Sequence, residues 1–246
     1  MILIGSIVNA IGIILGGTLG LILKGGIPKK TTELITTGLG IIIATIGIGY
    51  TLKSQALLVV IFSTIFGSLI GELINIEGNI ERFAKFAEKK MSKIGVGFST
   101  GFVTTSILYC VGSMAILGAL QSGLENKHDI LYAKSLMDAV LSIVFASTLG
   151  YGVIFSAVPV FIYQGILTLL SGTMAPYIGN NIIVEMTATG GILLIGIGLN
   201  VSEIKKVKVG NMLPAIFLPP ILIPLGAFLL KFWTLISNLL YGVITR

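Results

Sequence analysis

Charged residues are scarce in this sequence, and their scarcity sets the class of protein. Only 11% of the 246 residues are Asp, Glu, Lys or Arg, whereas a soluble domain has about 25%. Runs of about 18 or more apolar residues are candidates for transmembrane helices. The low charge content, several such runs and a mean hydropathy of +1.03 predict an all-α polytopic membrane protein. Four long stretches carry no charge at all: residues 1–23, 95–124, 139–184 and 209–230.

Cysteine and histidine are nearly absent, which removes several kinds of chemistry. The single cysteine, Cys110, excludes an internal disulfide, and the single histidine, His128, leaves no cluster of metal ligands. The chain also lacks a glycine-rich phosphate loop followed by lysine, so ATP-driven transport within it is not expected. Because no catalytic constellation is found, we expect no enzyme and no cofactor.

The charges that are present lie mainly between the apolar runs. The net charge of +6 could suggest a nucleic-acid partner, but cytoplasmic loops rich in Lys and Arg explain it better. The first charge, Lys24, follows the first apolar run, which is therefore predicted to be a retained span and not a cleaved signal. The expected partner is the lipid bilayer of the cytoplasmic (inner) membrane. The loops predicted to face the cytoplasm are residues 24–32, 77–94 and 203–210.

The apolar runs divide into as many as eight membrane segments. The charged stretch 77–93 has apolar residues at helical spacing, which fits an amphipathic helix on the membrane surface or a solvated connecting helix. The last segment carries four prolines, each of which opposes a regular helix, so it must be distorted. The segments are residues 2–23, 33–50, 56–74, 98–124, 135–150, 152–170, 181–200 and 212–237.

Two pairs of segments share a pattern that is anchored by polar residues. Ser6–Ala10 (SIVNA) resembles Ser135–Ala139 (SLMDA), and Glu33–Gly38 (ELITTG) resembles Glu185–Gly190 (EMTATG). Repeated halves are a common construction of secondary transporters, and we predict a duplication. Its parts are a first repeat (1–76), an interfacial helix (77–94), a central interrupted segment (95–130), and a second repeat (131–246) with residues 152–172 inserted.

Two topologies are compatible with these segments. If each segment crosses once, the members of the first pair run in the same direction and those of the second pair in opposite directions. If residues 98–124 and 152–170 are instead hairpins, both pairs become inverted, and the hairpin tips fall near Cys110–Ser113 and Pro159. The prediction is therefore six to eight segments with an inverted repeat and two interrupted or re-entrant segments.

The stretch 104–118 is apolar enough to lie in a bilayer but is interrupted. Gly112 and Ser113 stand at its centre, and small or hydroxyl side chains such as Thr105 and Cys110 surround them. Loosened backbone in a membrane is tolerated only against protein or a wet cavity. We therefore predict half of a substrate or ion site here, although Cys110 by itself is more typical of packing than of a nucleophile.

Asp138 is the most informative ionisable residue, because it lies within an apolar segment. A carboxylate buried in a membrane suggests function by default, here the binding of a cation or a proton. The alternative is an ion pair with Lys134, four residues earlier, at the helix end. The matching position in the first repeat is the neutral Asn9, so one cation site is expected and not two.

Other polar residues complete the predicted site on weaker grounds. Glu185 begins an apolar segment, where a carboxylate also suits the positive end of a helix. Ser156 and Gln164 lie in an uncharged segment, where polar residues often bond between helices instead. The predicted substrate- or ion-binding residues are Asp138, Cys110, Gly112, Ser113, Thr105, Ser156, Gln164, Glu185, Thr189 and Asn200.

The run Gly101–Gly118, GFVTTSILYCVGSMAILG, resembles the central motif of a bacterial family of integral membrane proteins of unknown function, catalogued as domain of unknown function 554. Lys134–Asp138 and Lys208–Ala215 look like further blocks of that family. Its members are sometimes labelled possible sodium channels or pumps, which is what implies sodium here. The family motif has Pro where Ser113 stands, which implies a softer break, and the family supplies no catalytic residues.

These observations lead to three functional hypotheses. The leading one is a secondary transporter or permease for a small solute or ion, coupled to sodium or protons. The alternatives are a passive ion channel and a non-transporting scaffold or accessory subunit. Glycine-rich spans also favour close helix contacts, so a homo-oligomer is a further expectation.

Overall fold

The computed structural model describes residues 2–24, 28–79, 82, 98–174, 176–228, 231 and 233, which form helices and turns without a strand. The first long helices are α1 (Ile4–Lys24), α2 (Lys29–Thr51) and α3 (Leu57–Ile74). The central part contains α5 (Phe98–Cys110), α6 (Ser113–Glu125) and α7 (Asp129–Leu149). Next come α8 (Gly152–Phe155), α9 (Ala157–Leu169), α10 (Ser171–Met174) and α11 (Asn180–Val201). The last elements are α12 (Val209–Met212), the 3-10 helix η1 (Leu213–Phe217) and the helical segment Pro219–Phe228.

The helices confirm the predicted all-α membrane fold. Six are long and apolar enough to cross a membrane: α1, α2, α3, α7, α8 continued by α9, and α11. Two bent pairs raise the number to eight if each is one span. They are α5 with α6, bent by 59°, and Val209–Phe217 with Pro219–Phe228, bent by 48°. The second bend lies among the prolines that predicted it, whereas most of the predicted amphipathic helix, residues 77–94, lies outside the described residues.

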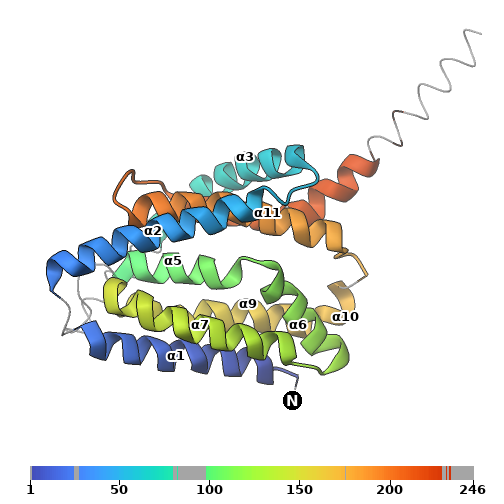
Figure 1. Ribbon diagram of the computed structural model, residues 1–246. Helices are drawn as coiled ribbons and strands as arrows, with labels where there is room; N and C mark the ends of the chain where they lie inside the picture. The colour runs from blue at the N-terminus through green and yellow to red at the C-terminus, as the bar shows by residue number, and fades with distance from the viewer. Residues whose placement is uncertain are drawn as a thin grey trace, which may run out of the picture.

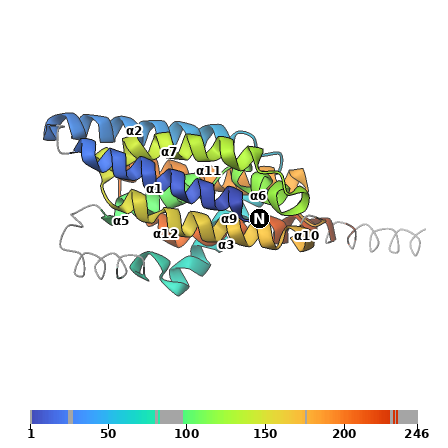
Figure 2. The same ribbon diagram turned by 90° about the horizontal axis from the view of Figure 1, so that it is seen from below.

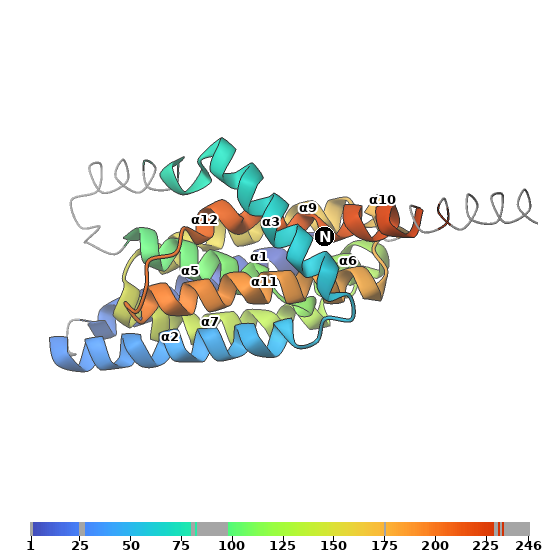
Figure 3. The ribbon, with the colours of Figure 1, turned by 90° about the horizontal axis from the view of Figure 1, so that it is seen from above.

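Helix α11 is the centre of the bundle. In an 18-residue apolar stretch of α11, 78% of the residues are buried, compared with 22% in the corresponding stretches of α2 and of α3. Figure 1 shows α3 above α11 and α5 below it, and Figure 3 shows α2 running alongside α11 and α3 crossing over it. Figure 2 shows α1, α7 and α9 on the opposite face of the molecule. Helices α2 and α3 thus expose apolar faces that suit lipid, and α11 is enclosed by protein.

Glycine contacts fix the direction of the first matched pair, α1 and α7. Gly5 lies against Leu131, near the start of α7. Gly20 lies against Ile143, farther along the same helix. The two helices therefore run parallel, and the glycines let them pack closely, as small residues do in membrane helices.

The second matched pair, α2 and α11, has the opposite arrangement. Gly40 lies against Ser202, just after the end of α11, and Gly47 lies against Gly191, near its middle. These helices are antiparallel. An inverted repeat needs one rotation that maps α1 onto α7 and α2 onto α11 and reverses the direction of both helices. Because only the second pair is antiparallel, the predicted inverted repeat over both pairs is wrong. The directions are those required when every segment crosses once.

The interrupted segment crosses the bundle and does not turn back. Phe98 at its start lies against Gly152, beside the end of α7. Near its other end, Ser122 donates a hydrogen bond to the carbonyl oxygen of Ile2, at 2.9 Å, at the opposite end of the bundle. The predicted hairpin with a tip at the break is therefore wrong, because the break bends the chain without reversing it. The second hairpin is wrong as well, since Pro159 lies inside α9.

Gly16 allows α1 to approach α7 beside Asp138. A Cβ at this position would overlap the backbone carbonyl group of Ala139, which no side-chain rotation can relieve. We expect Gly16→Ala to lower the free energy of unfolding by about 1–3 kcal/mol, measured by denaturant titration in detergent. Gly38→Ala and Gly49→Ala are matched controls, because a Cβ there meets nothing within 4 Å, and they should be neutral or stabilising. Equal losses in all three variants would contradict this account of helix packing.

Candidate functional site

Asp138 lies in a buried cluster with Lys134 of its own helix and Asn9 of α1. Lys134 donates hydrogen bonds to both carboxylate oxygens, to Oδ1 at 2.9 Å and to Oδ2 at 2.7 Å. Asn9 donates from Nδ2 to Oδ2 at 3.1 Å. The side chains of Lys134 and Asp138 are only 8% and 5% exposed. The predicted ion pair is confirmed, but it is buried in the bundle and not at a helix end.

The position of the pair follows from where α7 begins. The helix starts at Asp129 and not at residue 135, so Asp138 lies near the middle of its 21 residues. The residues before position 135 continue the helix because their side chains find partners in the bundle. Lys134 pairs with Asp138, and Leu131 lies against Gly5 of α1. Asp138 therefore lies in the middle of its helix and not near the start, where the predicted segment 135–150 would place it.

Aromatic and hydroxyl groups surround the ion pair. The Lys134 ammonium lies 5.8 Å from the centroid of the Tyr109 ring, within the range of a cation–π interaction. The hydroxyl groups of Tyr109 and Ser142 are 2.8 Å apart and buried. A buried ion is costly unless it is paired and hydrogen-bonded, so these partners explain how the pair persists in an apolar bundle.

The helix break lies next to this cluster. Helix α5 ends at Cys110, and Gly112 has φ +120°, a conformation that side-chain-bearing residues rarely adopt. Tyr50 of α2 has its hydroxyl 3.2 Å from the position of a Cβ on Gly112. On the other side, the Val111 side chain lies against Gly190 of α11. The break is thus enclosed by protein, as irregular backbone at membrane depth must be.

The structure brings three predicted site residues into one region: Cys110, Gly112 and Asp138. Tyr109, which directly precedes Cys110, connects them through its contacts with Lys134 and Ser142. Ser113 begins α6. Thr105 is buried and donates to the carbonyl oxygen of Gly101 in its own helix, at 2.7 Å.

The side chains of three other predicted site residues form local hydrogen bonds. The Ser156 hydroxyl donates to the carbonyl oxygen of Val153, at 2.6 Å, and that of Thr189 to the carbonyl oxygen of Glu185, at 2.8 Å. Asn200 donates to the carbonyl oxygen of Val207 at 2.8 Å and accepts from its N–H at 2.6 Å, which closes the loop after α11. In this structure the three side chains therefore satisfy backbone groups by hydrogen bonding.

Glu185 clamps the turn between α2 and α3. Its carboxylate accepts hydrogen bonds from the Ser54 hydroxyl at 2.6 Å, the Gln55 N–H at 2.7 Å and the Ala56 N–H at 3.0 Å. Glu185 is only 2% exposed. The sequence suggested that Glu185 serves the start of its own helix, but the free amide groups that it satisfies lie before α3.

With this geometry established, comparison with known proteins decides the family. Residues 4–224 match the family described as Protein of unknown function (DUF554). The chain belongs to the DUF554 family. It is 34% identical to the "Uncharacterized membrane protein YdfK" of Bacillus subtilis (strain 168), over 93% of this chain and 99% of the relative. It is 31% identical to the "Uncharacterized protein YqgA" of Escherichia coli (strain K12), over 87% and 94% respectively. No solved structure matches it.

This DUF554 protein also buries polar atoms that have no protein partner among the described residues. Gln164 of α9 is fully buried, yet both its amide nitrogen and its amide oxygen lack a hydrogen bond. The same holds for the hydroxyl groups of Ser6 and Thr168 and for Oδ1 of Asn9. Such groups cost free energy unless water, an ion or a solute satisfies them. The alternative role of Gln164, a hydrogen bond to a neighbouring helix, is not found in the part of the chain that is described.

Several residues of the DUF554 site were missed or given another role by the sequence. The sequence marks Lys134 only as a neutralising partner of Asp138, and Asn9 only as its neutral counterpart. Their spacing and the repeat were the signals that could have placed them in the site. Tyr50, Tyr109 and Ser142 gave no signal, because nothing in a single sequence shows which face of a helix meets the cluster. The described residues hold no group of three or more His, Cys, Asp or Glu that could bind a metal ion.

Proposed function

We propose that this DUF554 protein is a secondary transporter or permease, coupled to sodium ions or protons, that moves a small solute or ion. The observation that carries the proposal is the buried Lys134–Asp138 pair beside a broken helix. Charged residues within membrane segments commonly mark ion or substrate pathways. Broken helices near the middle of the membrane are where many transporters bind substrate and coupling ion.

In this proposal the ion pair is the coupling device. The Lys134 ammonium occupies the place that a sodium ion would take against the Asp138 carboxylate. A sodium ion needs several oxygen ligands, and Oδ1 of Asn9, which has no partner among the described residues, is one that lies beside Asp138. When a sodium ion or proton neutralises Asp138, Lys134 is released from both oxygens. The position of Lys134 therefore reports whether the cation is bound.

The break provides the moving part. Gly112 joins α5 and α6 at an angle of 59°, and Tyr109 links the end of α5 to Lys134. A change in the ion pair therefore acts directly on the helix that ends at the break. Alternating access in transporters consists largely of one group of helices rocking or closing against another. In this proposal α6 moves relative to α5 when Lys134 leaves Asp138.

The same proposal covers location and partners. We place the chain in the bacterial inner membrane with residues 24–32, 77–94 and 203–210 on the cytoplasmic side, because these loops carry most of its lysines. The lipid bilayer and a small solute or ion are its partners, and a homo-oligomer is compatible with its glycine-rich helices. The proposal assigns no catalytic step, no nucleic-acid partner and no cofactor beyond the coupling ion.

Asp138→Asn tests the proposal in proteoliposomes loaded with sodium. We expect exchange of radioactive sodium ion by the intact protein to saturate with sodium concentration. Exchange by the variant should fall by about tenfold or more, since each tenfold corresponds to about 1.4 kcal/mol. Asp129→Asn is the matched control, because Asp129 lies at the exposed start of the same helix, and it should leave exchange unchanged.

Two results would contradict the proposed function. Sodium flux that does not saturate would indicate a channel. If Asp138→Asn retained full sodium exchange and full proton flux, measured with a pH-sensitive dye inside the liposomes, Asp138 would not be the coupling residue.

A further inference from the structure

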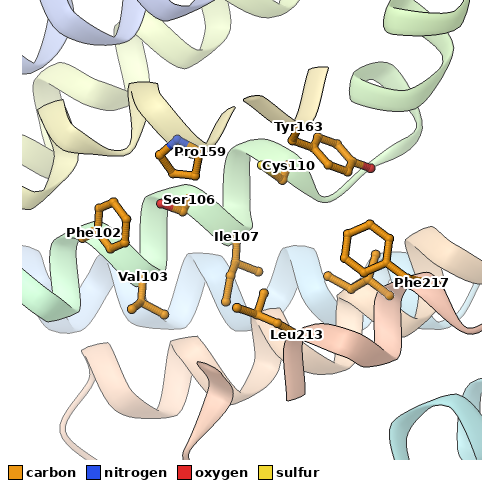
Figure 4. A pocket seen from close by; sticks show the side chains of 10 residues that line it. Phe102, Val103, Ser106, Ile107, Cys110, Pro159, Tyr163, Leu213 and Phe217 are labelled. Atoms are coloured by element: carbon orange, nitrogen blue, oxygen red, sulfur yellow. The ribbon is translucent and has the colours of Figure 1, made fainter. Parts of the chain in front are cut away.

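A cavity of about 300 Å³ lies between α5, α9 and η1, beside the helix break. Figure 4 shows Phe102, Ser106 and Cys110 along α5, with Pro159 of α9 above them and Leu213 of η1 below. Phe102 and Cys110 are eight residues apart in one helix, so the cavity follows α5 for about 12 Å. It is therefore an elongated space that ends at the break.

The wall of the cavity is almost wholly apolar. The hydroxyl oxygens of Ser106 and Tyr163 are buried within the protein, so these residues present carbon atoms to the cavity. No charged side chain of the described residues lines it. Phe217, at its edge, is 51% exposed. In a membrane protein such a space is open to hydrocarbon, and what fills it must be apolar, because a charged or polar group would lose its hydration there.

The cavity extends from the break toward one end of the bundle. At the break, Val111 lies against Gly190 of α11. Val209, where α12 begins, lies against Gly196 of the same helix, six residues or about 9 Å closer to the end of α11. Figure 3 shows that α5 begins where α11 ends. Phe102, about 12 Å back along α5 from Cys110, is therefore at about the depth of the start of α12.

Lysines gather at this same end, in the loop between α11 and α12. Residues 203–208 include three lysines and one glutamate. Lys205 and Lys206 are exposed, whereas Lys208 donates to a glutamate of α3 at 3.0 Å. The loop leads directly into α12, and Leu213 in the cavity wall follows Lys208 by five residues. One leaflet of a bilayer has about 15 Å of hydrocarbon, which matches the distance from these lysines to the break.

We infer that the cavity binds one acyl chain of an anionic phospholipid, whose phosphate lies at Lys205 and Lys206. The acyl chain fills a space that has no polar group to offer, and the two exposed ammonium groups attract the headgroup, as basic residues beside membrane helices do. The end of the acyl chain reaches Cys110, so the bound lipid packs α5 against α9 and η1 beside the break.

Native mass spectrometry of the intact protein, released from a mild non-ionic detergent, tests the inference. We expect the protein to retain one phospholipid per chain. When phosphatidylglycerol and phosphatidylcholine are supplied to the delipidated protein in equal amounts, we expect about tenfold more phosphatidylglycerol to be bound, because two lysines attract its charge. The mass of the bound species identifies the occupant directly.

Two variants fill the cavity from different sides. Leu213→Trp acts from η1 and Val103→Phe from α5. Each should lower the fraction of protein that carries a lipid about tenfold. Leu136→Trp is the matched control, because Leu136 lies on α7 and is 70% exposed, and it should leave the fraction unchanged. Helical circular dichroism shows which variants fold.

A lysine variant tests the headgroup without touching the cavity. Lys205→Gln/Lys206→Gln should keep one bound lipid and lose the preference for phosphatidylglycerol. Lys53→Gln/Lys127→Gln is its control, because these lysines are exposed in the turns after α2 and α6, at the other end of the bundle. It should keep the preference. Because the lysine variants change only exposed residues, they decide the question even if neither filled variant folds.

Three outcomes would overturn the inference. The first is a protein that binds no phospholipid, or binds as much in Leu213→Trp and Val103→Phe as in the intact protein. The second is a preference for phosphatidylglycerol that survives in Lys205→Gln/Lys206→Gln. The third is a dimer that these two cavity variants disrupt, since a second copy of the chain would then occupy the cavity. None of these outcomes depends on sodium exchange, so the lipid site and the proposed transport stand or fall separately.

Discussion

Replacing Lys134 with methionine should lower the free energy of unfolding by about 3–5 kcal/mol, the usual loss when one partner of a buried ion pair is removed. Methionine keeps much of the length of the side chain but carries no charge. Asp138 would then retain only the bond from Asn9 and would be a buried charge without a counter-ion. The measurement is a denaturant titration of the purified protein in detergent, followed by helical circular dichroism.

The double variant Lys134→Met/Asp138→Asn separates charge from shape. Removing both partners of a buried pair is often neutral or even stabilising, because the cost of desolvating both ions disappears together with their attraction. We expect the double variant to regain most of the stability that Lys134→Met loses, and to remain inactive in sodium exchange. A double variant as unstable as the single one would show that the packing of the lysine stem, and not its charge, stabilises the bundle.

Replacing Glu185 with leucine should destabilise the protein by about 3 kcal/mol or more. Hydrogen bonds to a charged group contribute about 1.5–3 kcal/mol each, and Glu185 accepts three of them from the turn between α2 and α3. Leucine would leave the backbone N–H groups of Gln55 and Ala56 without that partner. Glu185→Gln, which keeps one acceptor oxygen, should lose less. Glu125→Gln is the exposed control, since the Glu125 side chain is 51% exposed, and it should change stability little.

Hydrogen exchange locates the effect of Glu185 in the turn. In the leucine variant the amide hydrogens of Gln55 and Ala56 should exchange faster, by about tenfold for each 1.4 kcal/mol of local stability that is lost. Amides in the middle of α7 should exchange at the rate of the unmodified protein after correction for global unfolding. A uniform increase along the chain would contradict the assignment of Glu185 as a clamp of this turn.

Much of the fold was predictable because it depends on local composition. Uncharged runs predicted the membrane helices, and Gly112 predicted the break, since both signals lie within one stretch of chain. Spacing alone predicted the Lys134–Asp138 pair, because residues four apart lie on the same face of a helix. Small polar-anchored motifs also identified the pairs α1 with α7 and α2 with α11, which the structure places in direct contact.

The directions of the helices were not predictable in the same way. The choice between a crossing and a hairpin at Cys110–Ser113 was left to the balance of charged loops, and both topologies satisfied it. The structure decides for a crossing, because the two ends of α5–α6 contact opposite ends of the bundle. A glycine break carries no information about whether the chain continues or returns, since that depends on the helices that pack around it.

The sequence by itself therefore determined the class of protein, the approximate spans, the break and the carboxylate that needs a partner, all through hydropathy and spacing along one helix. Only the tertiary structure decided that Asn9 reaches Asp138, that Glu185 serves a turn in another part of the chain, and that a cavity opens beside Cys110. Each of these contacts joins helices that are distant in the sequence. Their formation depends on close packing between small residues, which a single sequence does not specify pair by pair.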